Sequence, residues 1–169
     1  QMIPYPNGAP GFYFARPRYI ENIREIIAAE KAELAKPVEE TLNLGGEIVR
    51  VVHSRLDMGT LVDAFDAKPF SVMRTLQDNP MVLEIFFPAP HSFTAVRVRV
   101  GGAPTRLTVL IYPADGGDPK VYSAEVGRSS DYRDLEIRLP APVDSSHIRL
   151  EIETIGESAP THVHVYEIQ

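Results

Sequence analysis

From about residue 47 to the C-terminus, apolar and polar residues alternate along the chain. This period of two is typical of strands that bury one side and expose the other to solvent. It predicts eight strands, at about residues 48–52, 83–87, 96–100, 107–112, 122–126, 135–139, 148–153 and 163–165. Turns rich in Gly, Pro and Asp separate these short strands, and no helical period lies between them. The pattern therefore indicates an all-β fold, an antiparallel sandwich or jelly roll, and not a parallel α/β sheet.

One α-helix is predicted ahead of the strands, at about residues 17–36. Ile20, Ile23 and Ile27 mark one face, and several alanines raise the helix propensity. Proline at residue 17 suits the first turn, and Pro37 ends the helix. Such a helix would cover a sheet or bridge to a preceding domain.

The chain is expected to divide into two parts. Residues 1–44 form a strap rich in proline and aromatic residues, followed by the helix, and residues 45–169 form the sandwich. The first 17 residues hold four prolines and four aromatic side chains. The strap either packs on its own domain or lies on a domain that precedes it.

Composition narrows the classes of function. The 169 residues carry 17 basic and 23 acidic side chains, a formal net charge of −6, which disfavours a nucleic-acid partner or an anionic membrane surface. The absence of cysteine excludes disulfides, thiol catalysis and cysteine-ligated metals. No apolar stretch approaches the roughly 20 residues that span a bilayer, and no signal peptide is visible. Because the chain begins at Gln1, we expect it to be a fragment of a longer protein.

Four segments occur in an order that points to a known fold. The loop Phe65–Ser71 is followed by Arg74-Thr75 and by the apolar run from Asn79 to Ile85, and the chain ends in His162–Ile168. This order resembles the discoidin-like family, also called coagulation-factor C-type or galactose-binding-domain-like, over about residues 45–169. The resemblance implies an antiparallel eight-stranded jelly-roll sandwich and, as the commonest activity, sugar binding.

In many members of that family the loop holds calcium together with a glutamate near the C-terminus. Asp66, Ser71 and Glu167 match those positions, so the resemblance implies calcium as a candidate cofactor. However, Lys68 brings a positive charge to the loop, and the alternative is that it pairs internally with Asp66 or Glu167. Ala67 also replaces the loop glycine of the family.

Glu167 raises a separate question. Alternation places it on the presumed core face, where a carboxylate must be paired, hydrogen-bonded or metal-bound. Alternatively, a bulge in the strand turns it outward.

The front half of the chain suggests a parent protein. The lead rich in proline and aromatic residues, the helix at Tyr19–Ile23 and the sandwich together resemble the soluble C-terminal segment of bacterial membrane glycosyltransferases of the dolichyl-phosphate-mannose mannosyltransferase type. The resemblance implies a membrane domain on the N-terminal side and an extracytoplasmic or cell-surface location. No catalytic motif of those enzymes lies in this chain.

Sugar binding usually combines an aromatic plate with polar groups. Trp is absent, so Tyr112, Tyr122 and Tyr132 are the candidate plates, unless they pack on the surface of the sheet. Arg97 and Arg99, with the nearby Arg106, are candidates to hold an anionic sugar or a lipid phosphate. Alternatively, these arginines form cross-strand pairs with carboxylates.

Other constellations carry weaker signals for chemistry. His162 and His164 lie on one face of a strand and could share a transition metal, or could simply be solvated. Glu151 and Glu153 lie together on an outward face and do not resemble the facing carboxyls of a glycosidase. No Gly-rich phosphate loop and no Gly-x-Ser-x-Gly elbow is present.

We therefore predict a non-catalytic, extracytoplasmic accessory domain of a membrane glycosyltransferase-like protein, which positions glycan or the parent enzyme. Its expected partners are carbohydrate and the preceding membrane domain, without nucleic acid. The alternative is a free-standing carbohydrate-binding module of the discoidin-like type. A third hypothesis, a small hydrolase on a jelly roll, would make the domain an enzyme.

Overall fold

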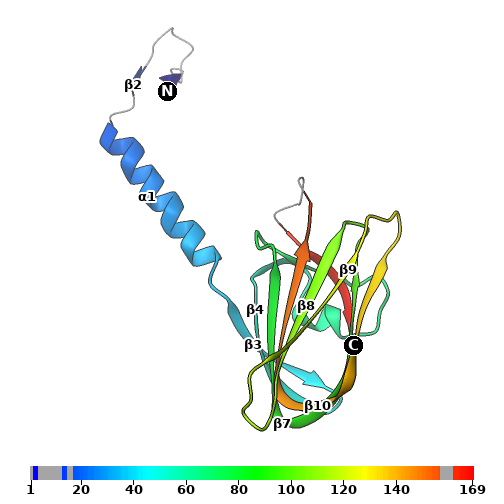
Figure 1. Ribbon diagram of the computed structural model, residues 1–169. Coiled ribbons are helices and arrows are strands. Elements are labelled where there is room, and N and C mark those ends of the chain that lie inside the picture. The colour runs from blue at the N-terminus through cyan, green and yellow to red at the C-terminus, as the bar shows by residue number, and fades with distance from the viewer. Residues whose placement is uncertain (1, 4–12, 15–16, 157–161) are drawn as a thin grey trace. The chain divides into compact units, whose positions relative to one another are not determined.

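A computed structural model describes residues 2–3, 13–14, 17–156 and 162–169 of the chain (Figure 1). The chain divides into two units, Gln1–Ala35 and Lys36–Gln169. The first unit contains two short antiparallel strands, β1 (Met2–Ile3) and β2 (Tyr13–Phe14), and one helix, α1 (Pro17–Leu34). The predicted helix is thus confirmed, whereas most of the predicted strap lies outside the described residues. In the described part of the chain, no helix is both long and apolar enough to cross a membrane.

The second unit is built from antiparallel strands. These are β3 (Val38–Leu44), β4 (Glu47–His53), β5 (Leu56–Met58), β6 (Met73–Thr75), β7 (Met81–Val100), β8 (Thr105–Tyr112), β9 (Lys120–Val126), β10 (Arg133–Thr154) and β11 (His164–Ile168). A short 3-10 helix, η1 (Leu61–Ala64), lies between β5 and β6.

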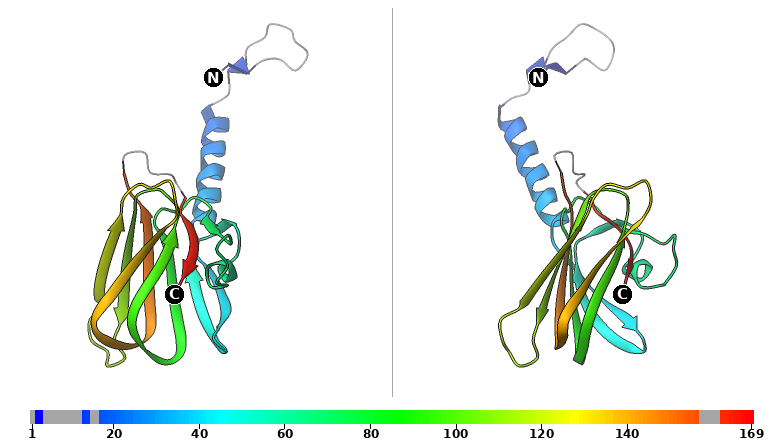
Figure 2. Two further views of the ribbon diagram at one scale, coloured as in Figure 1. Left: turned by 90° about the vertical axis from the view of Figure 1, so that its right-hand side faces the viewer. Right: turned by 45° about the vertical axis from the view of Figure 1, so that its right-hand side comes forward.

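Two long strands, β7 and β10, pass through both layers of the sandwich (Figure 2). The first half of β7 pairs with β4 and with the second half of β10, and the second half of β7 pairs with the first half of β10 and with β11. The β7–β10 register is interrupted between Arg138 and Val143 and again between Ser145 and His147. One layer therefore runs in the order β3-β4-β7-β10-β8-β9, and the other runs β10-β7-β11-β6-β5.

The buried faces of these strands form one hydrophobic core. Leu83 and Ile85 of β7, Val109 of β8 and Leu150 of β10 are at most 2% exposed, and each alternates with a polar or half-buried neighbour. The side chains that form the core are those that the period of two placed on the buried side of each strand. The prediction of an all-β antiparallel sandwich with one N-terminal helix is therefore confirmed.

The strands differ from the prediction in number and extent. Residues 83–87 and 96–100 are two halves of β7, and residues 135–139 and 148–153 are two halves of β10. Five further strands were not predicted: β1 and β2 of the first unit, and β3, β5 and β6 of the second. Strand β3 lies within residues 1–44, which the sequence assigned to the strap and helix, but it pairs along its whole length with β4.

A two-residue turn joins β3 to β4. Gly45 and Gly46 have φ values of +61° and +98°, which only glycine adopts readily. The Gly46 N–H donates to Oδ1 of Asn43 at 2.9 Å. This hairpin fixes the position of Glu40 on β3 relative to His53 on β4.

A stack of side chains crosses the outer face of the β3–β9 layer. His147 of β10 lies between Tyr112 of β8, with ring centroids 4.0 Å apart, and Phe86 of β7, at 4.2 Å. The guanidinium of Arg50 on β4 lies 3.8 Å from the Phe86 centroid. Burial between the two rings, only partly opposed by the Glu84 carboxylate, lowers the pKa of His147 below its ordinary value of 6.5.

This shifted pKa makes stability depend on pH. Because His147 binds a proton less readily when folded, the unfolded chain takes up more protons as the pH falls through about 6.5. We expect the free energy of unfolding to decrease between about pH 7.5 and pH 5.5, and to decrease less in His147→Phe, which keeps a stacked ring without a titrating group. Urea denaturation at both pH values measures this difference, and an equal loss in the two proteins would contradict the assignment.

Candidate functional site

The loop that matches the family's calcium positions is closed by internal contacts. The Asp66 carboxylate accepts the Lys68 backbone N–H at 2.9 Å, the Lys68 ammonium at 3.1 Å and the Ser71 hydroxyl at 2.8 Å. The Lys68 N–H, then the Ser71 hydroxyl and the Lys68 side chain, hold the pKa of Asp66 below its usual value. Ala67 has a φ of +56°, a backbone conformation that glycine adopts more readily than alanine.

Glu167 is turned away from the core by a bulge. The register of β11 on β7 is interrupted between Val165 and Glu167, after which Glu167 lies opposite Arg99 and Ile168 lies opposite the buried Val98. Opposed residues share a face of the sheet, so Ile168 takes the core position. Glu167 is 8% exposed and interacts electrostatically with the Arg99 guanidinium. The bulge alternative is the one observed.

These residues do not fit calcium. The ion requires six to eight oxygen ligands, but both Asp66 oxygens already accept donors and one of those donors is an ammonium group. Within the described ranges, no group of three or more His, Asp or Glu side chains could hold a metal. His162 and His164 are thus not part of such a group. Their rings meet edge to face, with centroids 5.4 Å apart.

The three candidate tyrosines do not form one plate. Tyr112 belongs to the His147 stack on one layer. Tyr122 of β9 is partly buried against the hydrophobic core. Only Tyr132 is largely exposed, at 49%, and it lies against a second tyrosine, Tyr166.

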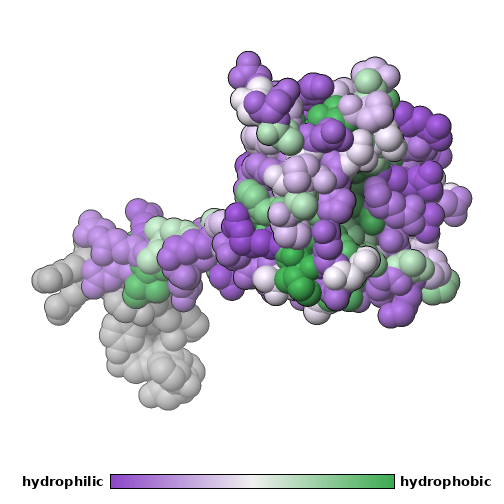
Figure 3. Space-filling model, turned by 90° about the horizontal axis from the view of Figure 1, so that it is seen from below, coloured by the Kyte–Doolittle hydropathy of each residue, from purple (hydrophilic) through white to green (hydrophobic). Residues whose placement is uncertain are grey.

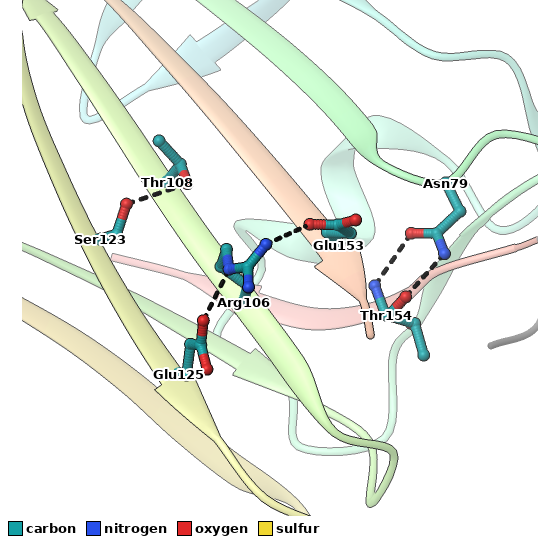
Figure 4. Close-up of polar contacts among 7 residues, drawn as sticks. All are labelled: Asn79, Arg106, Thr108, Ser123, Glu125, Glu153 and Thr154. Carbon is teal, nitrogen blue, oxygen red and sulfur yellow. Dashed lines mark hydrogen bonds and ion pairs between the residues drawn. The ribbon is translucent and has the colours of Figure 1, made fainter. Parts of the chain in front are cut away.

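The candidate arginines form cross-strand pairs with carboxylates. Arg99 holds Asp134 through two hydrogen bonds, of 2.9 and 3.3 Å, and Arg97 lies 3.6 Å from Glu136. Arg106 of β8 bridges Glu125 of β9 at 2.7 Å and Glu153 of β10 at 3.1 Å (Figure 4). Because their charges are already compensated, these arginines stabilise the sheet surface and are not poised to hold an anion.

A different row of polar side chains crosses the short strands of the other layer. Met73 and Thr75 are buried, so Arg74 between them points outward from β6. Its guanidinium holds Asp57 of β5 through two hydrogen bonds of 2.8 Å. On its other side Arg74 lies opposite His164 of β11.

Electrostatics set the charge state of this row. The Arg74 hydrogen bond lowers the pKa of Asp57, so the pair stays ionised as the pH falls. Burial, followed by His162 and Arg74, lowers the pKa of His164, and Asp57 opposes this shift. The row thus presents a fixed ion pair beside an imidazole that is neutral at pH 7.

An aromatic pair adjoins the row. Tyr166 follows His164 on β11, with the buried Val165 between them. The rings of Tyr132 and Tyr166 lie 4.5 Å apart and are tilted by 56°. Burial and the neighbouring Tyr132 raise the pKa of Tyr166. We call this surface the β11 face; it comprises Asp57, Arg74, Tyr132, His162, His164 and Tyr166.

The β11 face differs from the main apolar cleft in what it can bind. A cleft of about 200 Å³ opens between the layers and is lined by apolar side chains that include Phe65, Phe87, Phe93 and Ile168, with Gln169 as its polar residue. Seen from the end at which β7 and β10 bend, hydrophobic surface lies among hydrophilic residues (Figure 3). A polyhydroxylated ligand needs several hydrogen-bond partners, which the β11 face provides, whereas the described lining of the cleft offers the side chain of Gln169 alone.

Sequence reasoning identified only part of the β11 face. Tyr132 was proposed as a plate, and His162 and His164 were noticed as a pair on one strand. Asp57 and Arg74 were not proposed as site residues, because their contact joins residues far apart in sequence. The alternation that placed His162 and His164 outward also applied to Tyr166 and could have revealed it.

The sequence matches no protein-family model and no curated protein. Solved structures nevertheless share the fold. The family 32 carbohydrate-binding module of C. perfringens NanJ, solved with galactose, has a TM-score of 0.55 at 11% identity over 78% of this chain and 97% of that one. The family 32 module of AlyQ, solved with 4,5-unsaturated mannuronic acid, has a TM-score of 0.53 at 14% identity over 70% and 90%.

A larger protein also contains this fold. A Ruminococcus gnavus GH29 fucosidase in complex with fucose has a TM-score of 0.59 at 13% identity, over 91% of this chain but 30% of its own. This chain thus corresponds to less than a third of the fucosidase. At these identities the likeness establishes the fold alone, a β-sandwich of the kind found in family 32 carbohydrate-binding modules.

The closed loop leads to a prediction about calcium. The Lys68 ammonium and two further donors already hydrogen-bond to the Asp66 carboxylate. We therefore expect the melting temperature to be the same in millimolar calcium as in the presence of a chelator. Thermal unfolding followed by circular dichroism measures this. A rise of several degrees with calcium would show that the loop binds the ion after all.

Proposed function

We propose that the sandwich of residues 36–169 is a non-catalytic carbohydrate-binding module and that the β11 face holds the sugar. The observation that carries this proposal is the Tyr132–Tyr166 pair, of which Tyr132 is exposed, beside the Asp57–Arg74–His164 row. An aromatic surface next to directional polar groups is what an amphipathic sugar ring requires. The fold shared with sugar-binding modules supports the same function.

The chemistry of the face suits hydroxyl groups. The ring of Tyr132 offers an apolar surface to the C–H groups of a sugar. The guanidinium of Arg74 offers donors, the ionised Asp57 accepts, and the imidazole of His164 supplies a further polar group. Because the ion pair has two parallel hydrogen bonds, its geometry is fixed before a ligand arrives, which reduces the entropy lost on binding.

Binding is better supported than catalysis. Among the residues that make up the β11 face, Asp57 is the one carboxylate, and it is held by Arg74. Glu167, the neighbouring carboxylate on β11, is only 8% exposed. Glycoside hydrolysis generally needs two carboxyl groups on opposite sides of the scissile bond. The hypothesis of a small hydrolase therefore has no support from this face.

The protein to which this module belongs remains a prediction. The fucosidase, and an AlyQ structure that combines a family 32 module with an alginate lyase domain, carry this fold as a minor part of a longer chain. They support an accessory role in a larger carbohydrate-active protein. The membrane glycosyltransferase parent and the extracytoplasmic location rest on the sequence resemblance alone.

Calorimetric titration with galactose, fucose and galacturonic acid tests the proposal. We expect at least one of these sugars to bind, and Tyr132→Ala to weaken its affinity by about tenfold or more, since an exposed aromatic anchor is lost. Arg74→Lys should weaken binding similarly, because lysine cannot keep both hydrogen bonds.

Arg106→Lys is the matched control, since it alters an equally paired arginine on the other layer. It should leave the affinity unchanged. Absence of binding by all three sugars at millimolar concentration would refute the proposal. Equal losses of affinity in Arg74→Lys and Arg106→Lys would show that the sugar does not bind at the β11 face.

A further inference from the structure

Two of the five histidines of the chain lie together on the β11 face. The other three are engaged elsewhere. His53 is buried, Nε2 of His91 lies 2.7 Å from a carboxylate oxygen of β4, and His147 is stacked between two aromatic rings. His162 and His164 are therefore the imidazoles to consider for ligand binding.

Both imidazoles can be reached by a ligand. His164 lies between the buried Val163 and Val165, so alternation along the strand turns it outward, and His162 is turned the same way. Both side chains are only half-buried, and neither ring makes a hydrogen bond within the described ranges. The ring nitrogens that are buried without a partner belong to other histidines. The nitrogens of this pair are thus available as hydrogen-bonding groups.

The fixed charges around the pair already compensate one another. Asp57 of β5 and Arg74 of β6 hold each other through two hydrogen bonds of 2.8 Å. On β11 itself, Glu167 is 8% exposed and interacts with Arg99 of β7. On η1, Asp63 accepts the N–H and the hydroxyl of a threonine. Between pH 5 and pH 8 the net charge of the β11 face therefore depends on its histidines.

Without a ligand, these histidines are not readily protonated. His164 lies opposite Arg74, and burial, His162 and Arg74 lower the pKa of His164, whereas Asp57 opposes the shift. The two rings are also too close to carry two protons easily, since their centroids are 5.4 Å apart and two imidazolium ions repel each other. The free face is therefore close to neutral at pH 7.

A carboxylate on the ligand changes this balance. An anion beside an imidazole stabilises the charged form of the ring and raises its pKa. The imidazolium N–H then donates a charge-assisted hydrogen bond to the carboxylate oxygen, which is stronger than a bond between neutral groups. A hydroxyl group has no comparable effect on the ring. The carboxyl group of a sugar acid, like an α-carboxyl group, stays ionised down to pH 5.

We infer that the β11 face selects an acidic sugar over its neutral counterpart in mildly acidic solution, because the His162–His164 pair takes up a proton when the sugar carboxylate binds. The proton comes from solvent and goes to an unprotonated ring nitrogen, and no covalent bond of the sugar changes. The inference rests on the proposed function and adds to it the class of sugar and a pH dependence.

Calorimetric titration of the intact chain with galacturonate and with galactose, at pH 7.5 and pH 5.5, tests the inference. Since the bound state holds the additional proton more tightly, the affinity for galacturonate should rise by about tenfold as the pH falls. The affinity for galactose should change by less than about twofold. Repeating the galacturonate titration in two buffers with different enthalpies of ionisation measures proton uptake, which we expect to approach about one proton per site.

Asparagine variants locate the proton. Asparagine keeps hydrogen-bonding groups but does not titrate, so the double variant His162→Asn/His164→Asn should lose the rise in galacturonate affinity. His91→Asn is the matched control, because it changes a histidine that is paired with Glu47 outside the β11 face, and it should keep the rise. A general change in the charge of the protein with pH would act on both variants alike. Circular dichroism shows whether each variant is folded.

The contrary results are distinguishable. An equal pH dependence for the two sugars, the absence of proton uptake, or an undiminished rise in the folded double variant would overturn the inference and leave the proposed function standing. The first two results come from the unaltered chain and decide the matter even where the double variant does not fold. Absence of binding by both sugars at both pH values would refute the proposed function, and the inference with it.

Discussion

The pairing of β7 with β10 is the constraint on which the rest of the structure depends. Each strand crosses both layers. Its alternating side chains therefore contribute to the core in both layers, on either side of the bend. A shift of one residue in this register would move the core side chains of the shifted strand to the surface. The cross-strand arginines, such as Arg99 with Asp134 of the facing strand, then lie on the outer side of the same pairing.

Because of that constraint, the groups available for ligand binding lie on the short strands. On the long strands the outward polar residues are largely used in ion pairs or in the Tyr112–His147–Phe86 stack. β5 and β11 contain register breaks, at Asp57 and at Tyr166, and these bring an ion pair, an imidazole and two tyrosines onto one surface. The irregular positions are thus where ligand-binding groups gather.

Much of the fold was predictable, because a strand with one buried face leaves a period of two in the sequence. Strand β3 escaped prediction since, as an edge strand, it buries only Leu42, and β5 and β6 are too short to show a period. The site was less predictable. Contacts such as Arg74 with Asp57 depend on strand order, and the outward turn of Glu167 depends on a bulge that alternation alone could not locate.

We propose that a sugar binds on the outer surface of β5, β6 and β11. Amide ¹⁵N–¹H spectra of the assigned chain, recorded during a titration with galactose, test it most directly. We expect saturable shifts concentrated at Asp57, Arg74, His164 and Tyr166. Saturable shifts concentrated instead around Tyr112 and His147, or along the cleft beside Phe87, would contradict it.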